Sequence, residues 1–152
     1  MKTIEELENI RNEKRKELDL RVNTNSDTRE KHILVCRGTG CTSSKSPQII
    51  ENFRRIIEER NIQNVRVIQT GCFGLCAKGP IVIIRPEETF YAHVKPEDCE
   101  EIIDKHICNG QKVERLLCKD IDGTIVNKLD DLNFYKKQKR IALKNCGVID
   151  PE

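Results

Sequence analysis

Two pairs of cysteines, each placed shortly after a stretch typical of a β-strand, constrain this chain more than any other feature of its sequence. One pair encloses four residues and the other three: Cys36 and Cys41, Cys72 and Cys76. The apolar, β-branched stretches 32–35 and 65–68 predict the strands, and apolar residues recur at helical spacing between 49 and 57. A helix between two strands makes them parallel neighbours, whose carboxyl ends meet at one edge of a sheet. We therefore expect all four thiols to converge at that edge.

The central region predicts a small α/β (α+β) fold. Residues 81–84 (IVII) form an unbroken apolar run, as in a strand that is covered on both faces. A proline turn leads to an antiparallel partner at 90–94, and a second helix begins at Pro96 and ends at Asn109-Gly110. Ser46 is expected to cap the first helix, and residues 36–41 to form a glycine-bearing loop. The resulting order, β-α-β-β-α, is the pattern of a thioredoxin-like sheet.

The flanking residues divide the chain into three predicted regions. Residues 1–30 hold a charged helix over 3–20 and a polar linker over 23–30, and the helix has a thin apolar stripe: Ile4, Leu7, Ile10 and Leu18. Residues 31–110 form the thioredoxin-like domain. Residues 111–152 contain short apolar pieces and the basic stretch 136–140, without a convincing final element. We expect this extension to lead into a domain outside the sequence.

The composition argues against several classes of protein. Only 4% of the 152 residues are aromatic, and Lys plus Arg exceed Asp plus Glu by two, so the basic stripes and aromatic platforms of nucleic-acid readers are absent. No apolar run approaches the length of a membrane span or a signal peptide. We expect a cytoplasmic protein that neither binds nucleic acid nor inserts into a membrane. In that reducing compartment, eight cysteines favour metal or redox chemistry over a disulfide framework.

The paired cysteines are the expected ligands of a [2Fe–2S] cluster. Such a cluster needs four soft, anionic ligands, and thiolates supply them. Backbone N–H groups that point at sulfur stabilise the anionic cluster, and glycine allows the close approach or positive φ that this requires. We expect Phe73 and Leu75 to shield one side of the cluster from water. Five of the eight glycines lie within three residues of these cysteines: Gly38, Gly40, Gly71, Gly74 and Gly79.

Two alternative interpretations of the same cysteines are a structural zinc site and a dithiol switch. A structural zinc site tolerates similar spacings, although zinc knuckles favour tight hairpins rather than strand ends. A dithiol switch formed by Cys36 and Cys41 leaves the second pair unexplained.

A plant-type ferredoxin needs a further cysteine where Ser44 stands. The absence of C-x2-C excludes the thioredoxin dithiol and the bacterial four-iron motif, and no pair of histidines fits a Rieske centre. No self-contained catalytic site is evident.

The remaining cysteines and histidines have plainer interpretations. Cys99 lies on the apolar stripe of the second helix, where a thiol behaves as a small hydrophobe. Cys108 ends that helix and Cys118 follows a pair of leucines, and neither has a partner at ligand spacing. Cys146 lies in the tail, where it is available to a domain outside the sequence. We interpret His93 and His106 as surface or edge residues with satisfied hydrogen bonds rather than as metal ligands.

These motifs resemble the thioredoxin-like [2Fe–2S] ferredoxin family. The resemblance covers about residues 31–110 and depends on residues 35–41 (VCRGTGC), 70–76 (TGCFGLC) and 78–80 (KGP), with Tyr91 on the following strand. It implies a thioredoxin-like fold and one-electron transfer through a cluster on the four paired cysteines. Members that stand alone are often dimers, so a homodimer is among the expected assemblies.

The whole chain also resembles the N-terminal part of a flavoprotein subunit. Residues 5–7, 113–117, 134–140 and 145–147 are similar to the NADH-binding beta subunit of NAD(P)-linked, electron-bifurcating iron-only hydrogenases, and the tail is similar to that of the complex I-like NADH dehydrogenase. The resemblance implies other iron–sulfur subunits of a hydrogenase or dehydrogenase as partners. FMN and NAD(P) would bind in a following domain, so we assign neither to a residue of this sequence.

Overall fold

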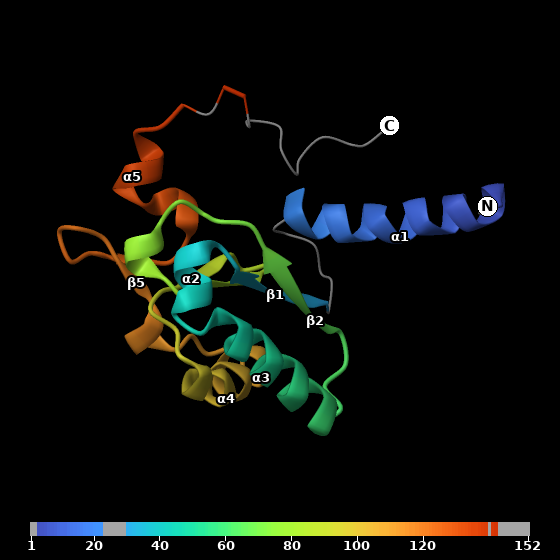
Figure 1. Ribbon diagram of the computed structural model, residues 1–152, viewed down its shortest axis with the longest axis horizontal. Coiled ribbons are helices and arrows are strands. Elements are labelled where there is room, and N and C mark those ends of the chain that lie inside the picture. The colour runs from blue at the N-terminus through green and yellow to red at the C-terminus, as the bar shows by residue number, and fades with distance from the viewer. Residues whose placement is uncertain (1–2, 23–29, 140, 143–152) are drawn as a thin grey trace.

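A computed structural model describes residues 3–22, 30–139 and 141–142 (Figure 1). The main sheet contains β1 (Lys31–Cys36), β2 (Val65–Thr70), β3 (Val82–Arg85) and β4 (Thr89–Tyr91), and a small hairpin contains β5 (Cys118–Lys119) and β6 (Ile125–Val126). The α-helices are α1 (Ile4–Val22), α2 (Thr39–Ser43), α3 (Ser46–Glu59), α4 (Cys99–Glu101) and α5 (Asn133–Lys136). A 3-10 turn (Pro96–Asp98) leads into α4, and a π-helical stretch (Ile102–Cys108) continues it. Further 3-10 turns are Cys76–Lys78, Glu114–Leu116 and Leu129–Asp131.

The four-stranded sheet has the order β2-β1-β3-β4. β1 is parallel to β2, whereas β1 with β3 and β3 with β4 are antiparallel. The predicted strand–helix–strand unit and the hairpin after it are therefore confirmed. Because β1 and β2 are parallel neighbours, the segments that follow them leave the sheet at the same edge.

Helices cover one face of the sheet. α3 and α4 pack side by side against it (Figure 1), and the apolar side chains of α3 are buried against alternate residues of β1 and β3: Ile49, Ile50, Phe53 and Ile56 against Ile33, Val35, Val82 and Ile84. A buried Ile or Phe contributes roughly 1.5–3 kcal/mol through the hydrophobic effect. The predicted cap at Ser46 is wrong. Lys45 precedes α3 in a left-handed conformation, and the buried hydroxyl of Ser46 has no hydrogen-bond partner among the described residues.

The segment after residue 112 covers the other face. Side chains of alternating strand residues point there because successive residues of a strand face opposite sides. Leu34, Ile83 and Phe90 pack on this face with Val126 and Leu132. Backbone hydrogen bonds add the segment to the edge of β4: the amide of Ala92 donates to the carbonyl of Leu116 over 2.9 Å, and that of Phe90 to Asn127 over 2.8 Å. The sequence did not predict β5, β6 or α5.

A buried polar group joins this segment to the helical side. The Tyr91 hydroxyl lies 2.8 Å from Nδ1 of His106 and accepts a hydrogen bond from the Val113 amide over 3.0 Å. Burial lowers the pKa of His106 to about 4, so its imidazole is neutral near pH 7. His106 is thus satisfied, as expected, but the expectation of a surface or edge position is wrong.

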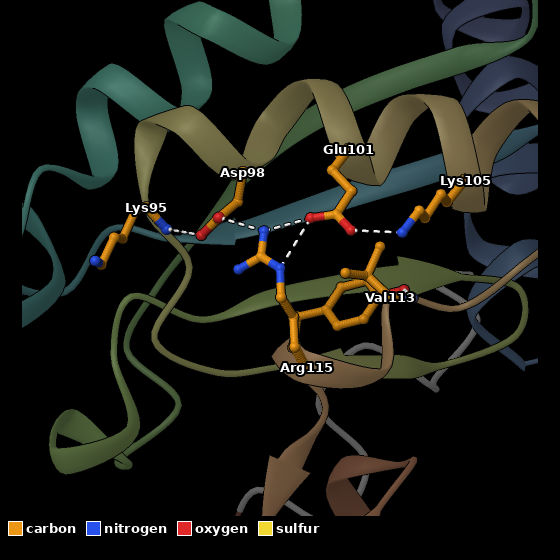
Figure 2. Close-up of polar contacts among 7 residues, drawn as sticks. Lys95, Asp98, Glu101, Lys105, Val113 and Arg115 are labelled. Atoms are coloured by element: carbon orange, nitrogen blue, oxygen red, sulfur yellow. Dashed lines mark hydrogen bonds and ion pairs between the residues drawn. The ribbon is translucent and has the colours of Figure 1, made fainter.

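Arg115 fastens the same segment to α4 and the turn before it (Figure 2). Its guanidinium donates to Oδ1 of Asp98 over 2.7 Å, and its Nε donates to Oε2 of Glu101 over 2.9 Å. The other carboxylate oxygen of Asp98 accepts from the Lys95 amide over 2.7 Å, which closes the turn. The Asp98 side chain is only 6% exposed, whereas Lys105, the other cation beside Glu101, is well exposed.

We expect Arg115→Gln to lower the free energy of unfolding by about 1 kcal/mol, because it removes a charged donor from a buried carboxylate. Urea unfolding measures this change. Lys105→Gln is the matched control, since it removes an exposed pair on the same helix and should cost only about 0.3 kcal/mol. Equal losses in the two variants would contradict the assigned role of Arg115.

The predicted N-terminal helix is confirmed as α1, which extends to one side of the sheet (Figure 1). Its apolar residues Ile4, Leu7 and Ile10 are exposed. The side chain of Leu18, linker residues 23–29, Arg140 and Cys146 lie outside the described residues. In the described ranges, no helix is both long and apolar enough to cross a membrane.

Candidate metal centre

The structure places all four predicted thiols at or beyond the ends of two parallel neighbouring strands. Cys36 is the last residue of β1, and Cys72 follows the last residue of β2, Thr70, by two positions. Cys41 lies in α2, and Cys76 begins a short 3-10 turn. Because Cys36 lies opposite Thr70 in the sheet, both following segments start at the same level.

The stretch before Cys41 differs from the prediction. Residues 39–43 form the short helix α2 rather than continuing a glycine-bearing loop. Its first turn closes when the amide of Thr42 donates to the carbonyl of Gly38 over 2.9 Å and that of Ser44 to Gly40 over 3.1 Å. Cys41 is consequently buried on the inner side of this helix.

The backbone of each segment touches a sulfur of the other. A Cβ atom added at Gly38 would lie 2.8 Å from Cβ and 3.0 Å from Sγ of Cys72. A Cβ atom added at Gly79 would lie 2.7 Å from Sγ of Cys41. Both positions therefore leave room only for hydrogen, and this absence of side chains lets the two cysteine segments pack against each other.

Gly74 and Gly71, the two glycines beside Cys72, differ in backbone conformation and surroundings. Gly74 has a φ of +80°, where a side chain would be strained, and its amide donates to Sγ of Cys72 over 3.3 Å. This is the predicted kind of backbone donation to a sulfur. Gly71 has neither a positive φ nor an atom within 4 Å of an added Cβ, so the predicted conformational role does not apply to it.

The four thiols form a buried pair and an exposed pair. Cys36 and Cys41 are 1% and 2% exposed, and Cys36 is close enough to raise the pKa of Cys41. Cys72 and Cys76 are exposed, with 3.9 Å between their sulfurs. Burial, followed by the hydrogen bond with Cys36 and its charge, raises the pKa of Cys41 to about 11. The hydrogen bond with Cys72 and its charge raise the pKa of Cys76, and the charge of Cys36 adds to this effect.

The raised pKa values of Cys41 and Cys76 indicate what kind of group the site suits. Negative charge on a neighbouring sulfur raises the pKa of a thiol, and a cation placed between the sulfurs has the opposite effect. In the part of the chain that the structure describes, no group of three or more His, Cys, Asp or Glu side chains gathers around one point. In a [2Fe–2S] cluster each iron takes two protein ligands. The two-by-two arrangement of thiols fits that cluster.

The other cysteines lie apart from this set. Cys99 is fully buried, and burial raises the pKa of its thiol to about 12, which confirms the interpretation as a small hydrophobe. Cys108 is exposed. Cys118 is buried in β5, on the sheet face that also holds Cys36. His93 is exposed and lies two residues after β4.

Sequence reasoning missed the contacts that the C-terminal segment makes with the second cysteine pair. The Tyr135 hydroxyl donates to the carbonyl of Phe73, between the two cysteines. Nζ of Lys78 donates to the carbonyl of Lys119 over 2.7 Å. Phe73 and Leu75 are partly buried and pack on the same face as Cys36. No spacing rule links positions 73 and 135, so the sequence carried no signal for this contact.

The comparisons with known proteins agree with this geometry. A family model for thioredoxin-like [2Fe–2S] ferredoxins matches residues 22–107. The 2Fe–2S ferredoxin of Clostridium pasteurianum is 43% identical over 94 residues, which cover 56% of this chain and 92% of the relative. The corresponding protein of Aquifex aeolicus is 34% identical over 97 residues, which cover 57% of this chain and 87% of the relative. The solved structure of the Aquifex aeolicus thioredoxin-like [2Fe–2S] ferredoxin superimposes with a TM-score of 0.53 over 57% of this chain and 88% of that one. The chain belongs to the thioredoxin-like [2Fe–2S] ferredoxin family.

Proposed function

We propose that Cys36, Cys41, Cys72 and Cys76 hold a [2Fe–2S] cluster and that the chain carries single electrons. The observation that supports this most directly is the arrangement of four thiols, in two pairs, at the shared end of β1 and β2. Membership of the ferredoxin family supports the identity of the cofactor.

The two cysteine pairs hold the cluster from opposite sides. Cys36 and Cys41 supply the inner ligands, on the side closed by the apolar sheet face. Cys72 and Cys76 supply the outer ligands on the solvent side, where the amide of Gly74 stabilises negative charge on sulfur. When bound, the cluster accepts and releases one electron. Electrons therefore exchange with a partner across the exposed outer side.

Analysis of the protein purified without oxygen tests this proposal. We expect a brown sample with about two irons and two acid-labile sulfides per chain, bleached reversibly by a one-electron reductant. A colourless sample that contains one zinc per chain would instead establish the zinc-stabilised interaction module. Turnover of a model disulfide that depends on Cys36 but not on Cys72 would establish the dithiol enzyme.

We further propose that the chain acts as the N-terminal ferredoxin-like domain of an NAD(P)H-linked oxidoreductase or hydrogenase subunit in the cytoplasm. Two kinds of observation support this: the resemblance of segments 113–117 and 134–140 to such subunits, and a family match that stops at residue 107. The partners would be other iron–sulfur subunits, which receive electrons from the exposed outer side of the site.

A stand-alone ferredoxin, able to form a homodimer, is the second candidate. It is favoured by the Clostridium pasteurianum relative, because the match uses 92% of that protein. The protein isolated from its source cells separates the two candidates. Bound FMN and more than two irons per polypeptide would support the oxidoreductase subunit, whereas about two irons and no flavin would support the ferredoxin.

A further inference from the structure

The segment that carries the outer thiols makes few hydrogen bonds with the rest of the described residues. Gly71 and Gly74 flank Cys72, and all three residues are exposed. The amide of Gly74 bonds within the segment, to Sγ of Cys72, and the carbonyl of Leu75 accepts from the nearby Lys78 amide over 2.9 Å. Exposed, glycine-containing segments with few buried contacts open readily. Something else must hold such a segment if its two sulfurs are to keep a fixed position.

Tyr135 of α5 provides that support. The Tyr135 hydroxyl donates to the carbonyl of Phe73. Within the described ranges, this is the hydrogen bond that joins residues 72–75 to a distant part of the chain. The Tyr135 ring packs on the same apolar cluster as Phe73 and Leu75. The Tyr135 side chain therefore donates to the backbone between the two outer thiols, while its ring packs on the apolar cluster that Phe73 and Leu75 also cover.

A second contact holds the far end of the same segment. Nζ of Lys78 donates to the carbonyl of Lys119 in β5 over 2.7 Å, and the amide of His93 donates to the carbonyl of Lys78 over 2.9 Å. β5 and α5 belong to the region 113–136, which lies outside the family match at 22–107. This region is itself anchored, through Arg115 and the Tyr91 hydroxyl, to the core of the domain.

We propose that Tyr135 is a positioning residue for Cys72 and Cys76, and that the region 113–136 serves as a brace for the outer side of the metal site. This inference rests on the proposed [2Fe–2S] function. Hydrogen bonds and solvent exposure around the sulfurs set the potential and the lability of such a cluster. By fixing the carbonyl between the two outer cysteines, Tyr135 limits both the movement of these ligands and the access of water.

Tyr135→Phe tests the brace, because it removes one hydroxyl and leaves the ring. We expect the iron chelator bathophenanthroline to bleach the anaerobic variant about fivefold faster than the wild type, the factor that corresponds to one hydrogen bond. Amide exchange of the peptide covering residues 71–79 should accelerate by a similar factor, and the midpoint potential should shift. Lys136→Gln is the matched control, since Lys136 lies in the same helix and pairs loosely with Asp131 at 4.0 Å.

The outcomes separate this inference from the proposed function. A wild-type protein without iron would overturn both. A wild type that holds two irons and two sulfides, together with a Tyr135→Phe variant whose bleaching or 71–79 exchange stays at the wild-type rate, would overturn only the role of Tyr135. Faster exchange spread evenly over the whole chain would show a general loss of stability, and it would also overturn this role.

Discussion

Cys41→Ala is expected to lower the iron and acid-labile sulfide bound per chain by about tenfold or more, because it removes one of four ligands from a site that cannot replace it. Cys41 is buried in α2, and the backbone of Gly79 lies directly against its sulfur. Water has little access to this side, so no outside ligand can fill the position. Iron and sulfide analysis of the anaerobically purified variant measures the loss.

Cys118→Ala is the control for that experiment. Cys118 is also a fully buried thiol, and it packs in the same apolar cluster as Cys36 and Cys41, on β5. Its replacement removes one sulfur from the core and should cost roughly 1–2 kcal/mol of stability while leaving the bound iron unchanged. If Cys118→Ala bleached the protein and Cys41→Ala did not, the ligand assignment would be wrong.

Gly38→Ala is expected to reduce bound iron nearly as much, although it changes no ligand. The added methyl group would lie 2.8 Å from Cβ of Cys72 and 3.3 Å from its Cα. Because part of this clash is with backbone, the two cysteine segments must move apart, and a ligand misplaced by about 1 Å no longer meets a common cluster. We expect about fivefold less iron per chain or worse, measured in the same assay.

Gly71→Ala is the matched control for this substitution. Gly71 precedes Cys72 and is exposed, and an added Cβ there meets no atom within 4 Å. Both variants therefore add the same methyl group beside the same cysteine pair, but only one of them separates the segments. Equal iron contents in the two variants would show that the close approach at Gly38 is unimportant.

The sequence predicted that the two cysteine segments leave the sheet at the same edge, because topology alone decides this. Two strands joined by an amphipathic helix are parallel neighbours, and Cys36 and Cys72 follow such strands. The helix itself was readable from the spacing of residues such as Ile49, Phe53 and Ile56, all of which are buried. The family match confirms both the thioredoxin-like fold and the [2Fe–2S] cofactor. The four ligands themselves stay a prediction.

Other features depend on contacts that no local pattern encodes. α2 begins at Thr39 with two glycines nearby, so propensity argues against it, and it forms because packing buries Cys41. Ser46 does not cap α3 because it is buried as the first residue of the helix, and Lys45 stands at the cap position. The region 113–136 has short apolar pieces that resemble no element in isolation. Its strands β5 and β6 pair with each other, and the residues beside them, Leu116 and Asn127, accept hydrogen bonds from the edge of the main sheet.

The two-sided covering of the sheet has a practical consequence for anyone who shortens this protein. A polypeptide cut at residue 107, where the family match stops, would bare Leu34, Ile83 and Phe90, which in the intact chain lie under Val126 and Leu132. Adjacent apolar residues exposed in this way form a hydrophobic surface patch that favours self-association or aggregation. Shortened versions intended for spectroscopy should therefore run at least through Lys136, the last residue of α5.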